Sequence, residues 1–165
     1  MKWGVGKARL LVVVLVVVVL LDQVTKLAVQ DNLALNQQVD VVGSVVRLTY
    51  IHNPGAAFGI YLGPLSRHVF LILSLLVLGV LAALFGFTPA HDRVRLLAIA
   101  LICGGALGNL VDRVRSPDGV VDFVDVGLGS MRWPVFNVAD VAVTAGAIGL
   151  ALSLWREDRR LEREE

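Results

Sequence analysis

The chain divides into long apolar stretches separated by more polar segments. Four stretches stay apolar over about 20 residues, the length that a helix needs to cross a bilayer. They lie at residues 10–29, 68–87, 94–112 and 135–155. The connections 30–67 and 113–134 are longer and more polar than the connection between the second and third stretches. This pattern predicts a single integral membrane domain over residues 1–165, built as an all-α bundle of four transmembrane helices.

Short β-rich runs occur in both long connections. In the first, VDVV and VVRLTYI flank Gly43-Ser44, and in the second, VVDFVDV follows the turn sequence Ser116-Pro117-Asp118-Gly119. Runs of Val, Ile and Thr that are bounded by turn residues are typical of short strands. We therefore expect a small β-sheet that rests on one surface of the membrane.

The composition supports a membrane protein and excludes several other classes. Hydrophobic residues make up 56% of the chain and charged residues only 18%, with a mean hydropathy of +0.75. Soluble domains are about one quarter charged. The net charge of +1 comes from scattered residues, without the aromatic-interleaved basic patch of a nucleic-acid surface. The single Cys103 cannot form an internal disulfide, and no His/Cys cluster predicts a metal, so we expect no cofactor.

Positive charges predict how the helices are oriented. Lysine and arginine are enriched in the short cytoplasmic loops of membrane proteins. Here they mark the N-terminal segment, the short connection around Arg93 and the C-terminal tail. Both termini are therefore expected on the cytoplasmic side, with the two long connections outside. The first stretch follows Lys2, Lys7 and Arg9 as in a signal peptide, but no clear A-x-A cleavage site follows, so we expect it to be retained.

Polar residues inside the spans gather at the outer ends. Charged groups near a membrane core are costly, so they are rare and usually functional. Three clusters each occupy one helix face, and none occurs at the inner ends: Asp22 with Lys26, Asn109 with Asp112 and Arg113, and Asn137 with Asp140. Any one cluster has a structural explanation, as a salt bridge, an end-of-helix pair or a helix cap. Three clusters at one depth instead favour a reaction site.

Paired carboxylates are the chemistry that these residues fit best. No serine in a nucleophile context accompanies the three histidines, and His-rich metal ligands are missing. Two neighbouring acids can share one proton, so that one acts as base and the other as acid. Asp122 lies in an apolar run, where burial should raise its pKa, and Asp140 lies near a helix start, where free N–H groups favour a negative charge. Asp125, on the other face of the same run, is the alternative to Asp122.

Five short motifs occur in an order known from one enzyme family. They are Asp22-Gln23-x-x-Lys26, Asn53-Pro54-Gly55-Ala56-Ala57-Phe58, Gly104-Gly105-x-x-Gly108-Asn109-x-x-Asp112-Arg113, Val121-Asp122-Phe123 and Phe136-Asn137-x-Ala139-Asp140. Together they resemble lipoprotein signal peptidase, the type II signal peptidase of bacteria. The Val-rich first span and the charged tail lie outside this pattern.

The resemblance implies an aspartyl endopeptidase of the cell inner membrane, which acts as a monomer among membrane lipids. Such an enzyme cuts a prolipoprotein just before a cysteine that carries a diacylglyceryl group, at the extracytoplasmic face. The family pattern also implies that the sheet cradles the substrate together with a short surface helix. On that pattern Asp122 and Asp140 are the catalytic dyad. The supporting and substrate-contacting positions are Asp22, Lys26, Asn53, Asn109, Asp112, Arg113 and Asn137.

Two other classes of protein remain open from the residues alone. A small ion or proton transporter subunit also carries intramembrane acids, but it should have polar residues along the full depth of the bundle. A structural assembly factor would use the charged pairs to hold the helices together, but it gives Asp122 no role.

Overall fold

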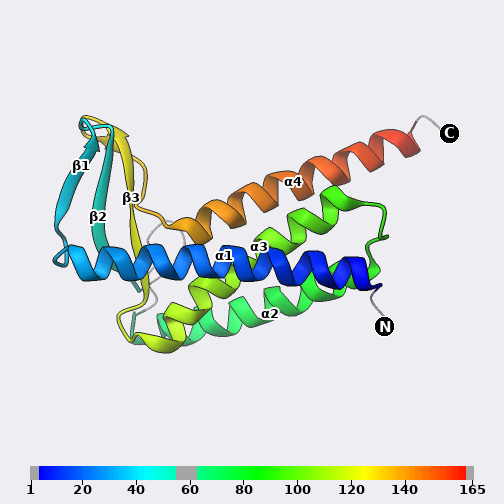
Figure 1. The fold of residues 1–165 in the computed structure, drawn as a ribbon, viewed down its shortest axis with the longest axis horizontal. Helices are drawn as coiled ribbons and strands as arrows, with labels where there is room; N and C mark the ends of the chain where they lie inside the picture. The colour runs from blue at the N-terminus through cyan, green and yellow to red at the C-terminus, as the bar shows by residue number, and fades with distance from the viewer. Residues whose placement is uncertain (1–3, 55–62, 163–165) are drawn as a thin grey trace.

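Four long helices dominate the computed structural model, which describes residues 4–54 and 63–162. Each is long and apolar enough to cross a membrane. They are α1 (Val5–Asn32), α2 (Ser66–Phe87), α3 (Arg93–Arg115) and α4 (Val138–Leu161). The helices run alongside one another, and the strands lie together at one end of the bundle (Figure 1). The predicted fold class, a four-helix membrane bundle with a small sheet, is confirmed.

The third helix, α3, is the one around which the others pack. It contacts α1, α2 and α4, and glycines let two of these helices approach closely. A Cβ atom at Gly104 would lie 2.9 Å from the Cβ of Val18, and one at Gly105 would collide with the carbonyl oxygen of Ala139. Farther from the sheet, the bundle core is apolar and consists of Leu81, Phe85, Leu96, Ile99 and Cys103.

Two helices start three or more residues away from the predicted positions. The last helix starts at Val138 and not at residue 135, because Phe136 is extended and pairs with Val124 of the sheet. The first helix starts at Val5, before the apolar stretch, and therefore includes Lys7.

Lys7 is a charged residue at the end of the bundle where the predicted spans carry no polar cluster. Its side chain is buried, and its Nζ donates to the carbonyl oxygens of Gly86 at 3.1 Å and Thr88 at 2.7 Å, where α2 ends. The free carbonyls of a helix end carry partial negative charge, so they stabilise a lysine. The position of Lys7 thus has a structural explanation, the closure of a helix end.

The sheet has four antiparallel strands in the order β1-β2-β3-β4. They are β1 (Gln38–Val42), β2 (Val46–Asn53), β3 (Val120–Leu128) and β4 (Met131–Arg132). The first three coincide with the β-rich runs of the sequence, whereas the two-residue β4 was not predicted. Gly43 turns β1 into β2 with a φ of 51°, a conformation that glycine adopts without strain. The sheet brings β2 and β3, which come from different connections, side by side.

The family pattern also implied a short surface helix. The described part of the first connection contains one short helical turn, the 3₁₀ helix η2 (Gly63–Leu65), just before α2. Residues 55–62 lie outside the described residues, and so does the Gly55–Phe58 part of the Asn-Pro-Gly-Ala-Ala-Phe motif.

Candidate active site

Asn137 and Asp140 form a reciprocal cap at the start of α4. The side-chain oxygen of Asn137 accepts the backbone N–H of Asp140 at 2.9 Å, and Asp140 Oδ2 accepts the backbone N–H of Asn137 at 3.1 Å. This is the capping-box arrangement, which satisfies two N–H groups that a helix start otherwise leaves free. The cap also fixes the carboxylate of Asp140 in one place.

Asn137 joins Asp140 to Asp122. Its Nδ2 donates to Asp122 Oδ1 at 2.7 Å, and the whole residue is buried from solvent. Asp122 comes from β3, in the second long connection, and Asp140 comes from α4. The two acids that the sequence singled out therefore lie on either side of one asparagine.

Asp122 is a buried acid on a strand. Its exposed fraction is 2%, and its Oδ2 accepts a hydrogen bond from Asn53 Nδ2 at 2.9 Å. Burial, with a smaller contribution from the negative charge of Asp140, raises the pKa of Asp122 to about 7, although the hydrogen bonds from Asn53 and Asn137 oppose the increase. The pKa increase expected from the apolar run around Asp122 is thus confirmed.

Every carboxylate oxygen of the two acids accepts an N–H group. Asp122 receives one from Asn53 and one from Asn137. Asp140 receives the backbone N–H of Asn137 on Oδ2 and the side-chain amide of Asn109, at 2.8 Å, on Oδ1. Such donors stabilise negative charge at a site from which water is largely removed.

A buried ion cluster close to Asp122 and Asp140 consists of Asp22, Lys26 and Asp112. Lys26 Nζ lies 2.8 Å from an oxygen of Asp22 and 2.8 Å from an oxygen of Asp112. The pairing of Asp22 with Lys26, one helical turn apart, follows the sequence prediction. Asp112 was expected to pair with Arg113, but its ion pair is with Lys26, because neighbouring side chains on a helix point in different directions.

Each acid of the ion cluster also holds one element that carries a candidate catalytic acid. Asp22 Oδ1 accepts the backbone N–H of Ala139, in the first turn of α4, at 3.0 Å. Asp112 Oδ2 accepts the backbone N–H of Val121, next to Asp122 on β3, at 3.1 Å. The cluster therefore ties α1 and α3 to the two elements that bring the acids together.

Arg113 brings a positive charge to the same end of the bundle. It is half-buried, and its charge interacts with those of Asp140, Asp112 and Asp122. Its one hydrogen bond from the side chain to a described residue goes to the backbone oxygen of Asn109, at 3.2 Å. Most of the N–H groups of its guanidinium thus remain available to a ligand.

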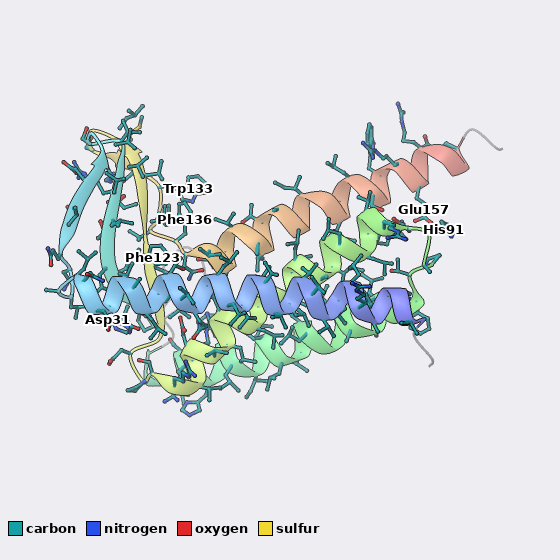
Figure 2. All side chains as sticks on the ribbon, in the orientation of Figure 1. Asp31, His91, Phe123, Trp133, Phe136 and Glu157 are labelled. Atoms are coloured by element: carbon teal, nitrogen blue, oxygen red, sulfur yellow. The ribbon has the colours of Figure 1, made fainter. Side chains whose placement is uncertain are left out.

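The other candidates from the sequence have different surroundings. Asp125 pairs with Arg132 at 2.6 Å and accepts a bond from Thr49 at 3.1 Å, so it links strands of the sheet. His52 shares a hydrogen bond of 2.8 Å with the hydroxyl of Tyr50. Figure 2 shows His91 near Glu157, at the far end of the bundle, whereas Phe123 and Phe136 lie at the sheet end.

Gln23 is a contributor to which the sequence gave no role. Its amide donates to Asp112 at 3.0 Å and to Asp22 at 3.2 Å. A small pocket of about 100 Å³ opens beside it, with Lys26 and Asp112 in the wall but neither Asp122 nor Asp140. The pocket is therefore not the place where the two acids meet a substrate. In the sequence, Gln23 was indicated only by its position in the Asp22-Gln23-x-x-Lys26 motif.

Known proteins resemble this chain in sequence and in fold. Residues 14–156 match the sequence profile of the family described as signal peptidase (SPase) II. The chain is 40% identical to the lipoprotein signal peptidase of Halothermothrix orenii over 89% of this chain and 96% of that protein. It is 41% identical to the lipoprotein signal peptidase of Geobacter sulfurreducens over 85% of this chain and 88% of that one. A bacterial membrane enzyme solved by the in meso method at 2.3 Å resolution superposes with a TM-score of 0.83 at 32% identity, covering 95% of this chain and 92% of that chain.

Proposed function

The chain belongs to the signal peptidase II family and removes signal peptides from prolipoproteins; we propose that it does so as an aspartic endopeptidase, with Asp122 and Asp140 as the catalytic pair. The observation that carries the proposal is the joining of these two acids through Asn137, with an N–H donor on each of their oxygens. A pKa of about 7 at Asp122 suits a group that must take up and release a proton near neutral pH.

The pair can hydrolyse a peptide bond while holding one proton between its members. The ionised acid takes a proton from a water molecule as the water oxygen attacks the scissile carbonyl carbon. The protonated acid gives its proton to the carbonyl oxygen, which forms a tetrahedral diol. When the diol collapses, the C–N bond breaks, the acid that took the proton from water gives it to the departing nitrogen, and the other acid takes the proton of one diol hydroxyl, so the pair again holds one proton.

The remaining site residues divide into a supporting group and a substrate-facing group. Asp22 and Asp112 support the site because they accept backbone N–H groups of α4 and β3, and Lys26 supports it because it pairs with both acids. Arg113 faces the substrate, because its guanidinium has free N–H groups beside the acids. We propose that it binds a carbonyl group of the substrate backbone near the scissile bond.

We propose that the cut falls just before a cysteine that carries a diacylglyceryl group, and that the enzyme acts as a monomer in contact with lipid. Apolar side chains are exposed along α1 and α2, where acyl chains can lie against them. They include Val12, Val13, Val16, Val17, Leu20, Ile72, Leu73 and Leu76. A lipid-anchored substrate would then present its peptide bond at the end of the bundle, where the acids lie.

We place the site on the extracytoplasmic side of the inner membrane, with both termini in the cytoplasm. This multi-pass protein has its sheet at one end of the bundle, and α1 begins and α4 ends at the other (Figure 1). Arg93 and Arg95, at the start of α3, also lie at that other end. Lysine and arginine are thus more frequent at the end far from the site, as they are at cytoplasmic ends.

The transporter alternative is not supported by the relatives, which are signal peptidases. The described core between the two ends of the bundle is also apolar, with Phe85 and Ile99 fully buried. An ion path needs polar groups through the whole membrane depth.

The deciding experiment is cleavage of a lipidated prolipoprotein by purified Asp122→Asn and Asp140→Asn variants. Each variant should fold and insert normally, yet leave the precursor uncut. Asp125→Asn is the matched control, because this acid lies on the same strand in an ion pair with Arg132 and should leave cleavage intact. Normal cleavage by either dyad variant would rule out the proposed pair.

A further inference from the structure

The ammonium group of Lys26 donates to three oxygen atoms. Besides the two carboxylates of the ion cluster, its Nζ donates to Asn109 Oδ1 at 3.0 Å. The residue is only 2% exposed. An ammonium group can donate hydrogen bonds but cannot accept them. The atom of Asn109 that faces Lys26 must therefore be the carbonyl oxygen.

This constraint decides which way the amide of Asn109 points. Because its oxygen faces Lys26, its NH₂ group faces the opposite way and donates to Asp140 Oδ1 at 2.8 Å. In the flipped orientation, NH₂ would meet the ammonium group and the amide oxygen would meet the carboxylate. Both contacts would be repulsive, so the charge of Lys26 excludes them.

Asn137 does not supply this constraint by itself. Its own direction is set by the cap at the start of α4. Its Nδ2 has two hydrogens and three acceptors within reach: Asp122 Oδ1 at 2.7 Å, Asn109 Oδ1 at 3.1 Å and the Val121 oxygen at 3.3 Å. It can satisfy Asp122 and Val121 and leave Asn109 free to turn. The charged group that donates to Asn109 is the ammonium group of Lys26. Hydrogen bonds that involve a charged group are stronger than those between neutral groups.

We propose that Lys26 is a positioning residue for catalysis: its charge fixes the amide of Asn109 so that an N–H group, and never an oxygen, faces Asp140. This inference rests on the proposed catalytic pair. An acid that must act as base works best when donors stabilise its ionised form. Without Lys26, Asn109 turns and presents its oxygen to Asp140 for part of the time, and ionised Asp140 becomes less available.

Lys7 provides a matched comparison within the same helix. It is also a buried lysine of α1, but it binds the backbone oxygens of Gly86 and Thr88 at the far end of the bundle. Lys7→Met therefore removes a buried charge from α1 and lowers the stability of the protein, but it leaves the amide side chains of the site unchanged.

A double-mutant cycle tests the inference, with kcat and KM measured on a lipidated precursor in detergent micelles. Lys26→Met should lower kcat about 10- to 100-fold, as expected for the loss of one hydrogen bond to a charged group, with KM changed less than about threefold. Asn109→Ala removes the amide and should cost a similar factor. Because Lys26 acts through Asn109, the double variant should fall less than about threefold below Asn109→Ala alone.

Lys7→Met is the control for this cycle. Lys7→Met should leave kcat unchanged when it is added to the unaltered enzyme and when it is added to Asn109→Ala, and it should lower only the unfolding temperature. If the losses from Lys26→Met and Asn109→Ala multiply instead, Lys26 acts independently of Asn109, by a direct effect of its charge on the acids or by general stability, and the inference is wrong.

Two further variants, Lys26→Gln and Asp122→Asn, complete the test. Thermal unfolding in detergent identifies the variants that fold. If Lys26→Met does not, Lys26→Gln, which removes the charge and can present either its oxygen or its N–H group to Asn109, enters the same cycle with the same interpretation. Asp122→Asn separates the two proposals: if it cleaves, the catalytic pair itself fails, whereas if it is inactive and the cycle multiplies, only the role of Lys26 fails.

Discussion

Replacing Asp122 with asparagine should change the stability of the protein in a way that reverses sign with pH. The folded protein holds the Asp122 proton with a pKa of about 7, against an ordinary value of 3.8. The folded state thus binds this proton more tightly than the unfolded chain does. The resulting stability is fully present below about pH 4 and is lost as the pH rises through about 7.

The structure sets the size of both effects. The interval from 3.8 to about 7 corresponds to about 4 kcal/mol, at about 1.4 kcal/mol per pH unit. Asparagine removes this dependence, but its NH₂ must face the amide donor of either Asn53 or Asn137. One buried hydrogen bond is then lost, at about 1–3 kcal/mol. Asp122→Asn should therefore be less stable than the unaltered protein at pH 4 and more stable at pH 8. The two free energies of unfolding should be equal at about pH 5–6.

The assay is the free energy of unfolding, measured in detergent for both proteins between pH 4 and pH 8. Asp118→Asn, which changes an exposed acid of the same connection, shows what the removal of a surface charge does. Cleavage of a lipidated precursor is measured on the same samples, and Asp122→Asn should have none. A stability difference that stays constant over this pH range, or that grows in the other direction, would refute the role of burial at Asp122.

Three further predictions concern the rest of the site. Asp140→Asn should leave precursor uncut, while unaltered enzyme should keep its activity with a chelator present; loss with chelator would indicate a metal. Gly105→Ala should destabilise the bundle by about 1–3 kcal/mol, because the new methyl group collides with the Ala139 oxygen, whereas Gly79→Ala has open space and should not; equal unfolding temperatures for the two would contradict this packing. Asp125→Asn should lower the unfolding temperature by breaking its ion pair yet preserve cleavage, and an inactive but folded variant would restore it as a catalytic candidate.

Several features of the site follow from the sequence, because they depend on local periodicity. Asp22 and Lys26 are one turn apart on a helix, and their side chains do meet at 2.8 Å. Asn137 and Asp140 have the spacing of a helix cap, and they form one. The apolar neighbours of Asp122 predicted its burial and its raised pKa.

Other features could not be read from spacing, because they join residues far apart in the chain. The partner of Asp112 is Lys26 from another helix, and not the adjacent Arg113. Asn53 was singled out by its motif alone, and the pairing of β2 with β3 brings its amide to Asp122. The start of α4 was placed too early because the apolar residue Phe136 serves the sheet and not the helix.

The sequence by itself determined the membrane character, the four helices, the three longer strands and the acids available for chemistry, since hydrophobic length and periodicity are properties of each segment alone. Only the tertiary structure decided which acids meet, and which amide atoms face them. That choice depends on the packing of α1, α3 and α4 around glycines and on a sheet built from two separate connections. Asn137 shows the reason most directly, because one side chain caps its own helix and also binds an acid on a distant strand.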